Sequence, residues 1–338
     1  RATHIMNNEF LYKQTIKYIE SANFTRALEC LKKLRKSDPC NAQYTNLEIL
    51  LKPRAVQEAS NVPQYNLLNL GCGQRYHSGW TNVDFKANSC EVIAHDLGKG
   101  LPFDSNSFNV VYHSHLLEHF SKEYAFTFLK NCFRVLKSGG IIRVVVPDLE
   151  TIARLYLLLL EKSLKGDVEA QHRYEWVMLE LFDQMVRNTS GGAMLEYWQQ
   201  NPMPAEDFVV QRLGSEVKDA IAKIRTNPGA TIQQSRQPDR RPDPHRIGQI
   251  RLSGEVHQWM YDRYSLSKLL QEVGFEDIRI CRADESRIPD FNSYLLDIEA
   301  DGSVRKPDSL FMEAKKPEND PVDTAVTVPR CFKWVGQI

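Results

Sequence analysis

The stretch YNLLNLGCGQRYHSGWTNVDF, residues 65–85, decides the fold of this chain. Its first apolar run ends at the turn Gly71-Cys72-Gly73, and a second short apolar segment ends at Asp84. Glycine lets the main chain approach a ligand closely, because it has no Cβ and tolerates positive φ. A carboxylate at the next strand's tip can accept hydrogen bonds from both hydroxyls of a ribose. The stretch predicts two strands around a ligand-binding glycine turn, and an ordinary tight turn is the alternative.

Alternating strand and helix patterns continue beyond this stretch. They predict a helix at residues 124–136 and strands at 66–70, 81–85, 92–96, 108–112 and 141–146. This alternation is typical of a parallel sheet with helices on both faces. After the fifth strand, Asp148 is predicted to cap a helix that begins a long helical insertion. The sheet resumes with a helix and two strands before residue 317.

Three strings between residues 66 and 150 carry a resemblance to a known family. They are GCGQRYHSGWTNVD, HDLGKGLPFDSNSFNVVYHSHLLEH and RVLKSGGIIRVVVPDLE. In order and content they resemble the class I S-adenosylmethionine-dependent methyltransferases. The resemblance implies an α/β fold with a Rossmann-like, seven-stranded methyltransferase sheet and a helical insertion after strand five. It also implies S-adenosyl-L-methionine as the cofactor.

The resemblance assigns cofactor contacts by position. Gly71 and Gly73 would border the methionine part, Asp84 the ribose, and Asp96 with its neighbour the adenine. The whole predicted set is Asn69, Gly71, Cys72, Gly73, Asp84, Phe85, Asp96, Leu97 and His113. The chain departs from the family at Asn69, where many members carry an acidic residue. It departs again between the turn and Asp84, because about ten residues are too few for a complete crossover helix.

Candidate catalytic residues follow the fourth strand. Ligands of open α/β sheets bind beyond the carboxyl ends of the strands, where His113, His115, Glu118 and His119 are expected. Methyl transfer from a sulfonium needs alignment and, for an oxygen acceptor, a base. We predict His115 and His119 as catalytic, with His257 where the insertion rejoins the fold. For each histidine, a packed residue without a role in proton transfer is the alternative.

Two other kinds of site, a zinc-peptidase site and a nicotinamide-binding site, use some of the same residue types. The string HLLEH spells H-x-x-E-H, the inverted zinc-peptidase motif, and two histidines with a glutamate can bind zinc. The motif is short and no third ligand stands out, so we assign no metal. The turn GCGQRY lacks the third glycine of the dinucleotide fingerprint, which disfavours a nicotinamide enzyme.

The strings LPF, LEH, VPDLE and HQWMYD resemble a bacterial methyltransferase subgroup associated with glycan and secondary-metabolite pathways. This resemblance implies O-methylation of a sugar, a glycan or another small hydroxylated acceptor, including one that carries a phosphate. N-methylation of a natural product or peptide is one alternative. A catalytically inactive interaction module is another, favoured by Asn69 and the short first crossover.

The predicted domain boundaries follow these patterns. A helical hairpin at 7–56 resembles a single tetratricopeptide-like repeat, and the cofactor-binding core spans 60–150. The helical substrate cap spans 151–255, the last part of the core sheet 256–317, and a tail 318–338. A single repeat cannot bury its apolar face alone, so the hairpin is expected to contact the core, another protein or a second copy. A plain helical cap on the core is the alternative.

The composition of the chain limits its substrate class and its location in the cell. Lys+Arg and Asp+Glu are both 43 in 338 residues, and this balance disfavours a nucleic-acid substrate. Seven scattered cysteines without a C-x-x-C pair favour a reducing, cytoplasmic location. The aliphatic run at 155–160 is far shorter than the ~20 residues of a membrane span. Arginines in the loop 226–251 suit a phosphate, although a solvated segment is the alternative.

Overall fold

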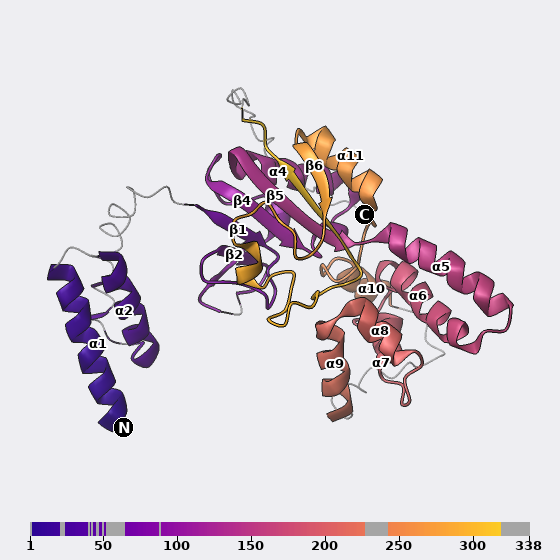
Figure 1. Cartoon of the computed structure of the whole chain (residues 1–338), viewed down its shortest axis with the longest axis horizontal. Helices are drawn as coiled ribbons and strands as arrows, with labels where there is room; N and C mark the ends of the chain where they lie inside the picture. Colours follow the sequence, from indigo (N-terminus) through magenta and orange to yellow (C-terminus); the bar gives the residue numbers. More distant parts are fainter. Residues whose placement is uncertain are drawn as a thin grey trace. The chain divides into compact units, whose positions relative to one another are not determined.

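The computed structural model describes residues 2–20, 24–39, 41, 43–44, 47–48, 51, 65–87, 89–226 and 243–318. The chain divides into two compact units, one up to Tyr65 and one from Asn66 onward (Figure 1). The predicted tail lies outside the described residues from 319 onward, and so do residues 227–242 of the arginine-rich loop. Among the described helices, none combines the length and apolar character that a membrane crossing requires.

The first unit contains two helices, α1 (Ala2–Glu20) and α2 (Phe24–Ser37). Helix α2 is amphipathic, because its buried residues Ala27, Leu31 and Leu34 recur at the spacing of one helix face. Together with Leu51 they form a small core of their own. The helices expected in 7–56 are therefore present, with α1 beginning earlier than predicted.

The second unit contains one seven-stranded sheet in the order β3-β2-β1-β4-β5-β7-β6. The strands are β1 (Leu67–Leu70), β2 (Thr81–Asp84), β3 (Val92–Ala94), β4 (Phe108–Ser114), β5 (Leu136–Pro147), β6 (Glu276–Cys281) and β7 (Ser309–Lys315). Strands β1 to β5 pair in parallel, whereas β7 runs antiparallel between β5 and β6. The predicted Rossmann-like sheet is confirmed. Strand β5 begins earlier than expected, directly after the preceding helix.

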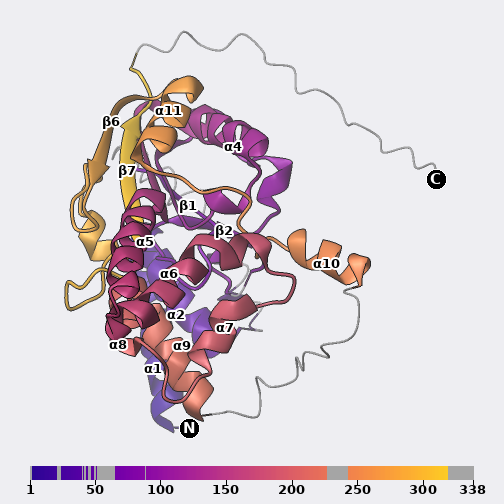
Figure 2. The same cartoon turned by 90° about the vertical axis from the view of Figure 1, so that its right-hand side faces the viewer.

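Helices cover one face of this sheet. Helix α4 (Lys122–Val135) and helix α11 (Arg263–Val273) lie on the same side of the strands (Figure 2). Phe128 and Leu129 of α4 and Leu266 of α11 pack against strand residues such as Val111. The apolar side chains of α4 recur at helical spacing, so their burial accounts for the placement of this helix.

The connection between β6 and β7, which includes the short helix η3 (Phe291–Tyr294), packs on the other face. A charge network fastens it there. Arg143 of β5 is fully buried and donates to Asp297 over 2.7 Å and to Glu313 over 2.9 Å. The hydroxyl of Tyr112 donates to Asp297 over 2.6 Å. The buried cation is thus paired with two carboxylates, which offsets the cost of its desolvation.

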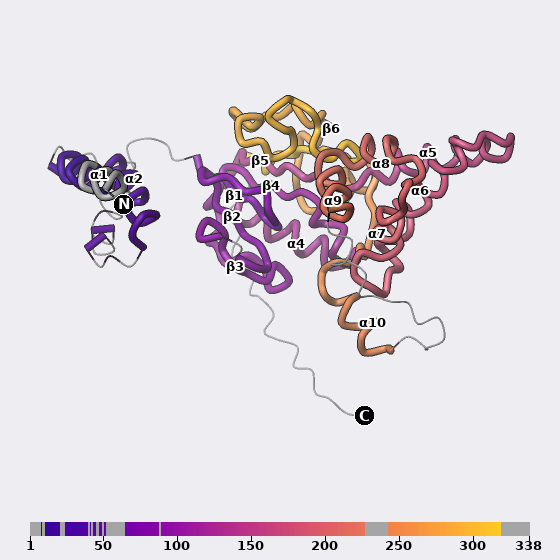
Figure 3. Tube along the Cα trace, turned by 90° about the horizontal axis from the view of Figure 1, so that it is seen from below, coloured from indigo at the N-terminus to yellow at the C-terminus, as the bar shows by residue number. Residues whose placement is uncertain are grey.

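The helical insertion begins at the carboxyl end of β5. Its helices are α5 (Leu149–Leu164), α6 (Val168–Val186), α7 (Gly192–Trp198), α8 (Glu206–Leu213), α9 (Ser215–Thr226) and α10 (Pro244–Arg251). Figure 3 shows α5 to α9 gathered beyond one end of the sheet. Asp148 caps α5, because its carboxylate accepts from the N–H of Glu150 and the hydroxyl of Thr151, as predicted. The chain leaves and re-enters the core at one place, where Asp148 and Tyr261 form a parallel bridge.

Candidate functional site

The glycine turn after β1 has the backbone conformation that glycine permits. Gly71 has φ +63° and Gly73 has φ +53°. A Cβ on Gly71 would lie 2.9 Å from Cδ1 of Leu116, whereas one on Gly73 would meet no described atom within 4 Å. Gly71 therefore lets the segment after β4 pack closely against the turn, and Gly73 borders open space.

Asp84, at the end of β2, faces this turn. Its Oδ2 accepts a hydrogen bond from the N–H of Gly73 over 2.8 Å, and its Oδ1 accepts from the N–H of Lys86 over 3.3 Å. A carboxylate oxygen can accept more than one hydrogen bond, so both oxygens retain capacity for ligand hydroxyls. The arrangement is compatible with the predicted ribose contact.

Three predicted cofactor residues in or beside the turn, Asn69, Cys72 and Phe85, differ in exposure. Asn69 is buried, and its Nδ2 donates to the carbonyl of Arg75 over 3.0 Å and to Oδ1 of Asn82 over 3.2 Å. Its amide group therefore holds the short link between β1 and β2. Cys72 is also buried, and burial raises the pKa of its thiol to about 11. Phe85 is 67% exposed and available to a flat ligand.

The predicted adenine-side residues lie after β3 at the short helix η1 (Leu97–Lys99). Asp96 caps η1, since its Oδ1 accepts from the N–H of Gly98 over 2.9 Å. The side chain of Leu97 is buried in the main core. Asp96 is thus the more accessible member of this pair.

His113, also predicted to border the cofactor, lies inside the core. Its side chain on β4 is fully buried and packs edge-on against Phe128, with ring centroids 5.3 Å apart. Neither ring nitrogen has a hydrogen-bond partner among the described residues. Burial lowers its pKa to about 3, so the imidazole is neutral at neutral pH. It does not line open space in this structure.

The three predicted catalytic histidines lie close together around the short helix η2 (Leu117–His119). His115, at φ +51°, turns the chain out of β4 and its Nε2 lies 2.8 Å from Oγ of Ser309. Nδ1 of His119 lies 3.3 Å from the carbonyl oxygen of Val256. The rings of His119 and His257 meet edge to face with centroids 4.8 Å apart.

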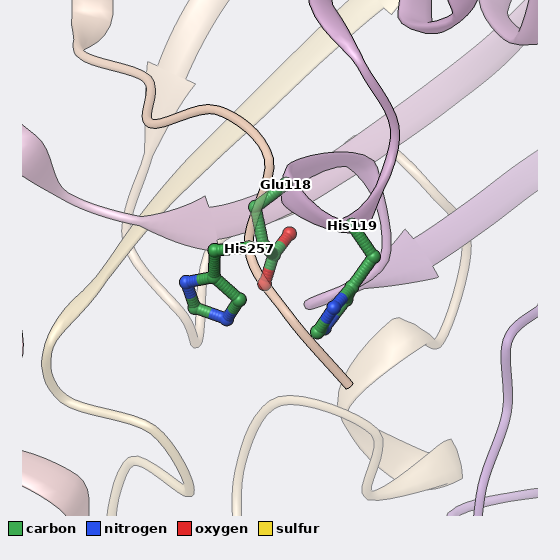
Figure 4. Close-up of side chains that lie close together, drawn as sticks. All are labelled: Glu118, His119 and His257. Atoms are coloured by element: carbon green, nitrogen blue, oxygen red, sulfur yellow. The ribbon is translucent and has the colours of Figure 1, made fainter. Parts of the chain in front are cut away.

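Glu118 completes this group. Its side chain has no exposed surface, and Nδ1 of His115 lies 3.5 Å from its Oε1. Both carboxylate oxygens lack a hydrogen-bond partner in the described part of the chain. One ligand atom each from Glu118, His119 and His257 lies within 4.8 Å of the other two. Figure 4 shows the carboxylate between the two imidazole rings.

Burial sets the charge state of the cluster. It lowers the pKa of His119 to about 4 and the pKa values of His115 and His257 well below the usual value. It raises the pKa of Glu118 to about 8. The imidazoles are therefore neutral at neutral pH, and Glu118 favours its protonated form when no cation is nearby.

Sequence reasoning identified the histidines but not their partners. The motif pairs Glu118 with His115 and His119, whereas the structure adds His257 from the far end of the insertion. No local spacing relates His257 to the motif, because only the return of the insertion to the core brings it there.

The sheet order, with β7 antiparallel between β5 and β6, is that of the class I S-adenosylmethionine-dependent methyltransferases. Residues 68–144 match the family model described as a methyltransferase domain. This stretch thus resembles a methyltransferase domain, the class that the three sequence strings predicted.

Further comparisons add structural similarities of low identity. No curated protein sequence matches the chain. The CurJ carbon methyltransferase is 10% identical with a TM-score of 0.33, and the alignment covers 78% of this chain and 52% of CurJ. This chain thus spans about half the length of that structure.

Two other solved structures align over a similar share of the chain. A SAM-dependent methyltransferase from Archaeoglobus fulgidus is 14% identical with a TM-score of 0.31, over 79% of this chain and 93% of that one. Phosphoethanolamine N-methyltransferase 2 of Haemonchus contortus, in complex with S-adenosyl-L-methionine, is 11% identical with a TM-score of 0.30. The alignment covers 79% of this chain and 52% of that one. Alignments at these scores say nothing further about the reaction of this chain.

Proposed function

We propose that this chain transfers a methyl group from S-adenosyl-L-methionine to a hydroxyl of a small acceptor, a sugar or glycan. The closeness of Leu116 to Gly71 carries the proposal: a Cβ added at Gly71 would lie 2.9 Å from Cδ1 of Leu116, so the histidine-bearing segment lies against the glycine turn. The predicted methyl donor site and the candidate bases thereby lie next to each other. Such proximity is the main requirement of a transfer whose leaving group is already good.

In this proposal the cofactor lies against the glycine turn. The open space beside Gly73 receives its methionine part, Asp84 accepts hydrogen bonds from the ribose, and Asp96 with Leu97 borders the adenine. The orientation of Asp84 toward the turn supports these roles. Bound there, the cofactor supplies an activated methyl group.

The acceptor hydroxyl loses its proton to an imidazole of the cluster formed by His115, His119 and His257. A hydroxyl needs such a base, whereas a neutral amine acceptor needs less help. The grouping of His119 with His257, and of His115 beside Glu118, supports an oxygen acceptor over the alternative of N-methylation.

A sugar ring also fits the surface next to the cluster. Trp259 is 38% exposed, and Nζ of Lys122 lies 5.0 Å from the centroid of its ring. An exposed aromatic face can stack on a sugar. The nearby ammonium group would suit an acceptor that bears a phosphate. The resemblance to the bacterial glycan-associated subgroup supports the same class of acceptor.

Two assays test this function. Calorimetry with S-adenosylmethionine and its demethylated product should show binding of both by the full chain. Transfer of labelled methyl to a panel of sugars, sugar phosphates, phenols and amines should then label hydroxyl compounds. Labelling of amines alone would contradict O-methylation, and absence of cofactor binding would contradict the function as a whole.

We also propose that the protein acts in the cytoplasm and that the α1–α2 hairpin contacts a protein partner or a second copy. The scattered cysteines support the location, and the small core of the hairpin supports the contact. Light scattering over a range of protein concentrations tests the second copy, since a homodimer would dissociate on dilution.

A further inference from the structure

In the part of the chain that the structure describes, the carboxylate of Glu118 is buried without the hydrogen bonds that a buried carboxylate needs. The side chain is completely buried, and neither carboxylate oxygen has a hydrogen-bond partner among the described residues. A buried polar group without a hydrogen-bond partner destabilises the fold, and a buried charge does so more strongly. Buried carboxylates are normally paired or coordinate a metal. The described residues offer this group one ion-pair contact, with Nδ1 of His115 at 3.5 Å from Oε1, and no hydrogen bond.

Two further imidazoles flank the carboxylate (Figure 4), which makes no hydrogen bond within the described part of the chain. One ligand atom each from Glu118, His119 and His257 lies within a mutual distance of 4.8 Å. Two histidines and one glutamate form a donor set that binds catalytic zinc and leaves a position open for a further ligand. All three side chains point toward a common region in Figure 4.

Surrounding contacts orient these side chains. Nδ1 of His119 lies 3.3 Å from the carbonyl of Val256, so donation there leaves Nε2 with its lone pair free. Nε2 of His257 lies 2.9 Å from Nε2 of Gln184, and the main-chain N–H of His257 donates to the carbonyl of Gln184 over 3.0 Å. Rotation of the Gln184 amide by about 180° places its Oε1 opposite Nε2 as an acceptor, which leaves Nδ1 of His257 with its lone pair for a metal. Metal-binding histidines characteristically have such partners on the second ring nitrogen.

The main chain holds the two contributing segments together. The carbonyl of Glu118 accepts hydrogen bonds from the N–H groups of Gln258 over 2.7 Å and Trp259 over 3.2 Å. The segment carrying Glu118 and His119 is thereby fixed against the segment carrying His257. A fixed arrangement lowers the cost of assembling a three-residue site.

The nearby cationic side chains of Lys306 and Arg187 pair with carboxylates other than Glu118. Lys306 lies 3.5 Å from Glu216, and Arg187 is paired with Asp183 over 2.5 Å and Glu255 over 3.1 Å. Their charges are thus largely balanced by other carboxylates, and neither side chain donates a hydrogen bond to Glu118.

We propose that Glu118, His119 and His257 bind one Zn²⁺ ion. The site extends the chemistry of the chain beyond the proposed methyl transfer and does not depend on it. It differs from the H-x-x-E-H arrangement, because His257 takes the place of His115, which is bonded to Ser309 instead. With the metal bound, the lone pairs of His119 and His257 are engaged, and His115 is the remaining candidate base.

The test is a zinc titration of the full-length chain after removal of metals with a chelator. Calorimetry should show one equivalent of Zn²⁺ bound. Co²⁺ should give the visible absorption of a four-coordinate site with nitrogen and oxygen ligands. The loss of an outer-shell partner typically weakens metal affinity about 10–100-fold, so Glu118→Gln and His257→Gln should each weaken it at least about 100-fold.

A matched control separates this site from other metal-binding side chains. His172→Gln removes an exposed histidine of α6 outside the cluster and should retain one equivalent at unchanged affinity. Zinc should raise the unfolding temperature of the wild type and of His172→Gln but not that of the nearly isosteric Glu118→Gln. The proposal is overturned if the wild type binds no zinc, or if Glu118→Gln and His257→Gln, folded by circular dichroism, bind it as the wild type does. Neither zinc binding nor the unfolding temperature depends on turnover. The zinc proposal can therefore be judged even if no methyl transfer is detected.

Discussion

The main-chain N–H of Gly73 donates a hydrogen bond to Oδ2 of Asp84 over 2.8 Å. This bond links the glycine turn after β1 to the end of β2, and it turns the carboxylate toward the open space beside Gly73. The two features that suggested a binding site in the sequence are thus in direct contact. Changes at either residue test the proposed cofactor site.

Replacement of Asp84 should weaken cofactor binding. In Asp84→Ala, the hydrogen bonds proposed between a charged acceptor and the ribose are lost, at a cost of about 1.5–3 kcal/mol. This corresponds to roughly a 10- to 150-fold rise in Kd. Calorimetry with S-adenosylmethionine measures the change, and Glu91→Ala, near the same strands, serves as the control. Equal affinity in wild type and Asp84→Ala would remove Asp84 from its proposed role.

The two glycines of the turn should respond differently to alanine. Both changes place a Cβ at positive φ, which costs about 1–2 kcal/mol. In Gly71→Ala the new Cβ also approaches Leu116 to 2.9 Å, so a further cost of about 1–3 kcal/mol is expected. Urea unfolding should show Gly71→Ala to be the less stable variant. The new Cβ of Gly73→Ala enters the proposed cofactor space, so this variant should lose affinity more than stability.

Removal of Arg143 should destabilise the fold strongly. In Arg143→Met, Asp297 and Glu313 lose a fully buried cation, and breaking a buried ion pair typically costs about 3–5 kcal/mol. Urea unfolding measures the loss. Arg282→Met, whose side chain is exposed beside Asp284, should unfold near the wild-type midpoint. Similar midpoints for both variants would show that the network does not hold the β6–β7 connection.

His113 should make stability depend on pH. Its folded pKa is lowered to about 3 by burial, so below about pH 6.5 the unfolded chain binds a proton that the native state does not. Stability from this group is therefore present above pH 6.5 and is lost as the pH falls toward 3. Between pH 7 and pH 5 the loss is about 2 kcal/mol.

The variant His113→Leu removes this titrating group and its two unpartnered nitrogens. Denaturant unfolding at pH 7 and pH 5 should show a smaller fall in the variant than in the wild type. The exposed control His172→Gln should keep the wild-type fall. A fall in His113→Leu as large as that of the wild type would show that another group causes the acid sensitivity.

His115 should matter for turnover more than for binding. The proposed base acts on the acceptor rather than on the cofactor, so His115→Gln should lower kcat about 10²–10⁴-fold with cofactor affinity nearly unchanged. Steady-state kinetics and calorimetry separate the two quantities. Unchanged turnover would favour an amine acceptor.

Local patterns predicted much of the fold. The strand positions, the glycine turn and the cap formed by Asp148 depend on neighbours in the sequence, and all are present. The start of β5 was predicted at residue 141, whereas the strand begins at Leu136, directly after helix α4. Pairing of Leu136 with Phe108 of β4 begins the strand there instead, and only the assembled sheet supplies that partner.

Long-range contacts explain what the sequence could not predict. In the sequence, Arg143 is a charged residue within an otherwise apolar strand. Its burial depends on ion pairs with Asp297 and Glu313, which belong to later segments of the chain. The sequence predicted His257 at the return of the insertion, but only the folded chain shows that it lies next to Glu118 and His119. Neither grouping has a spacing in the sequence from which it can be inferred.

The bridge between Asp148 and Tyr261 has a consequence for the evolution of specificity. Since the exit and return points of the chain adjoin, residues can be inserted into or deleted from the helices between them without displacing the strands of the sheet or the glycine turn. His257 lies near the return point, so such changes would alter the surroundings of the histidine cluster first.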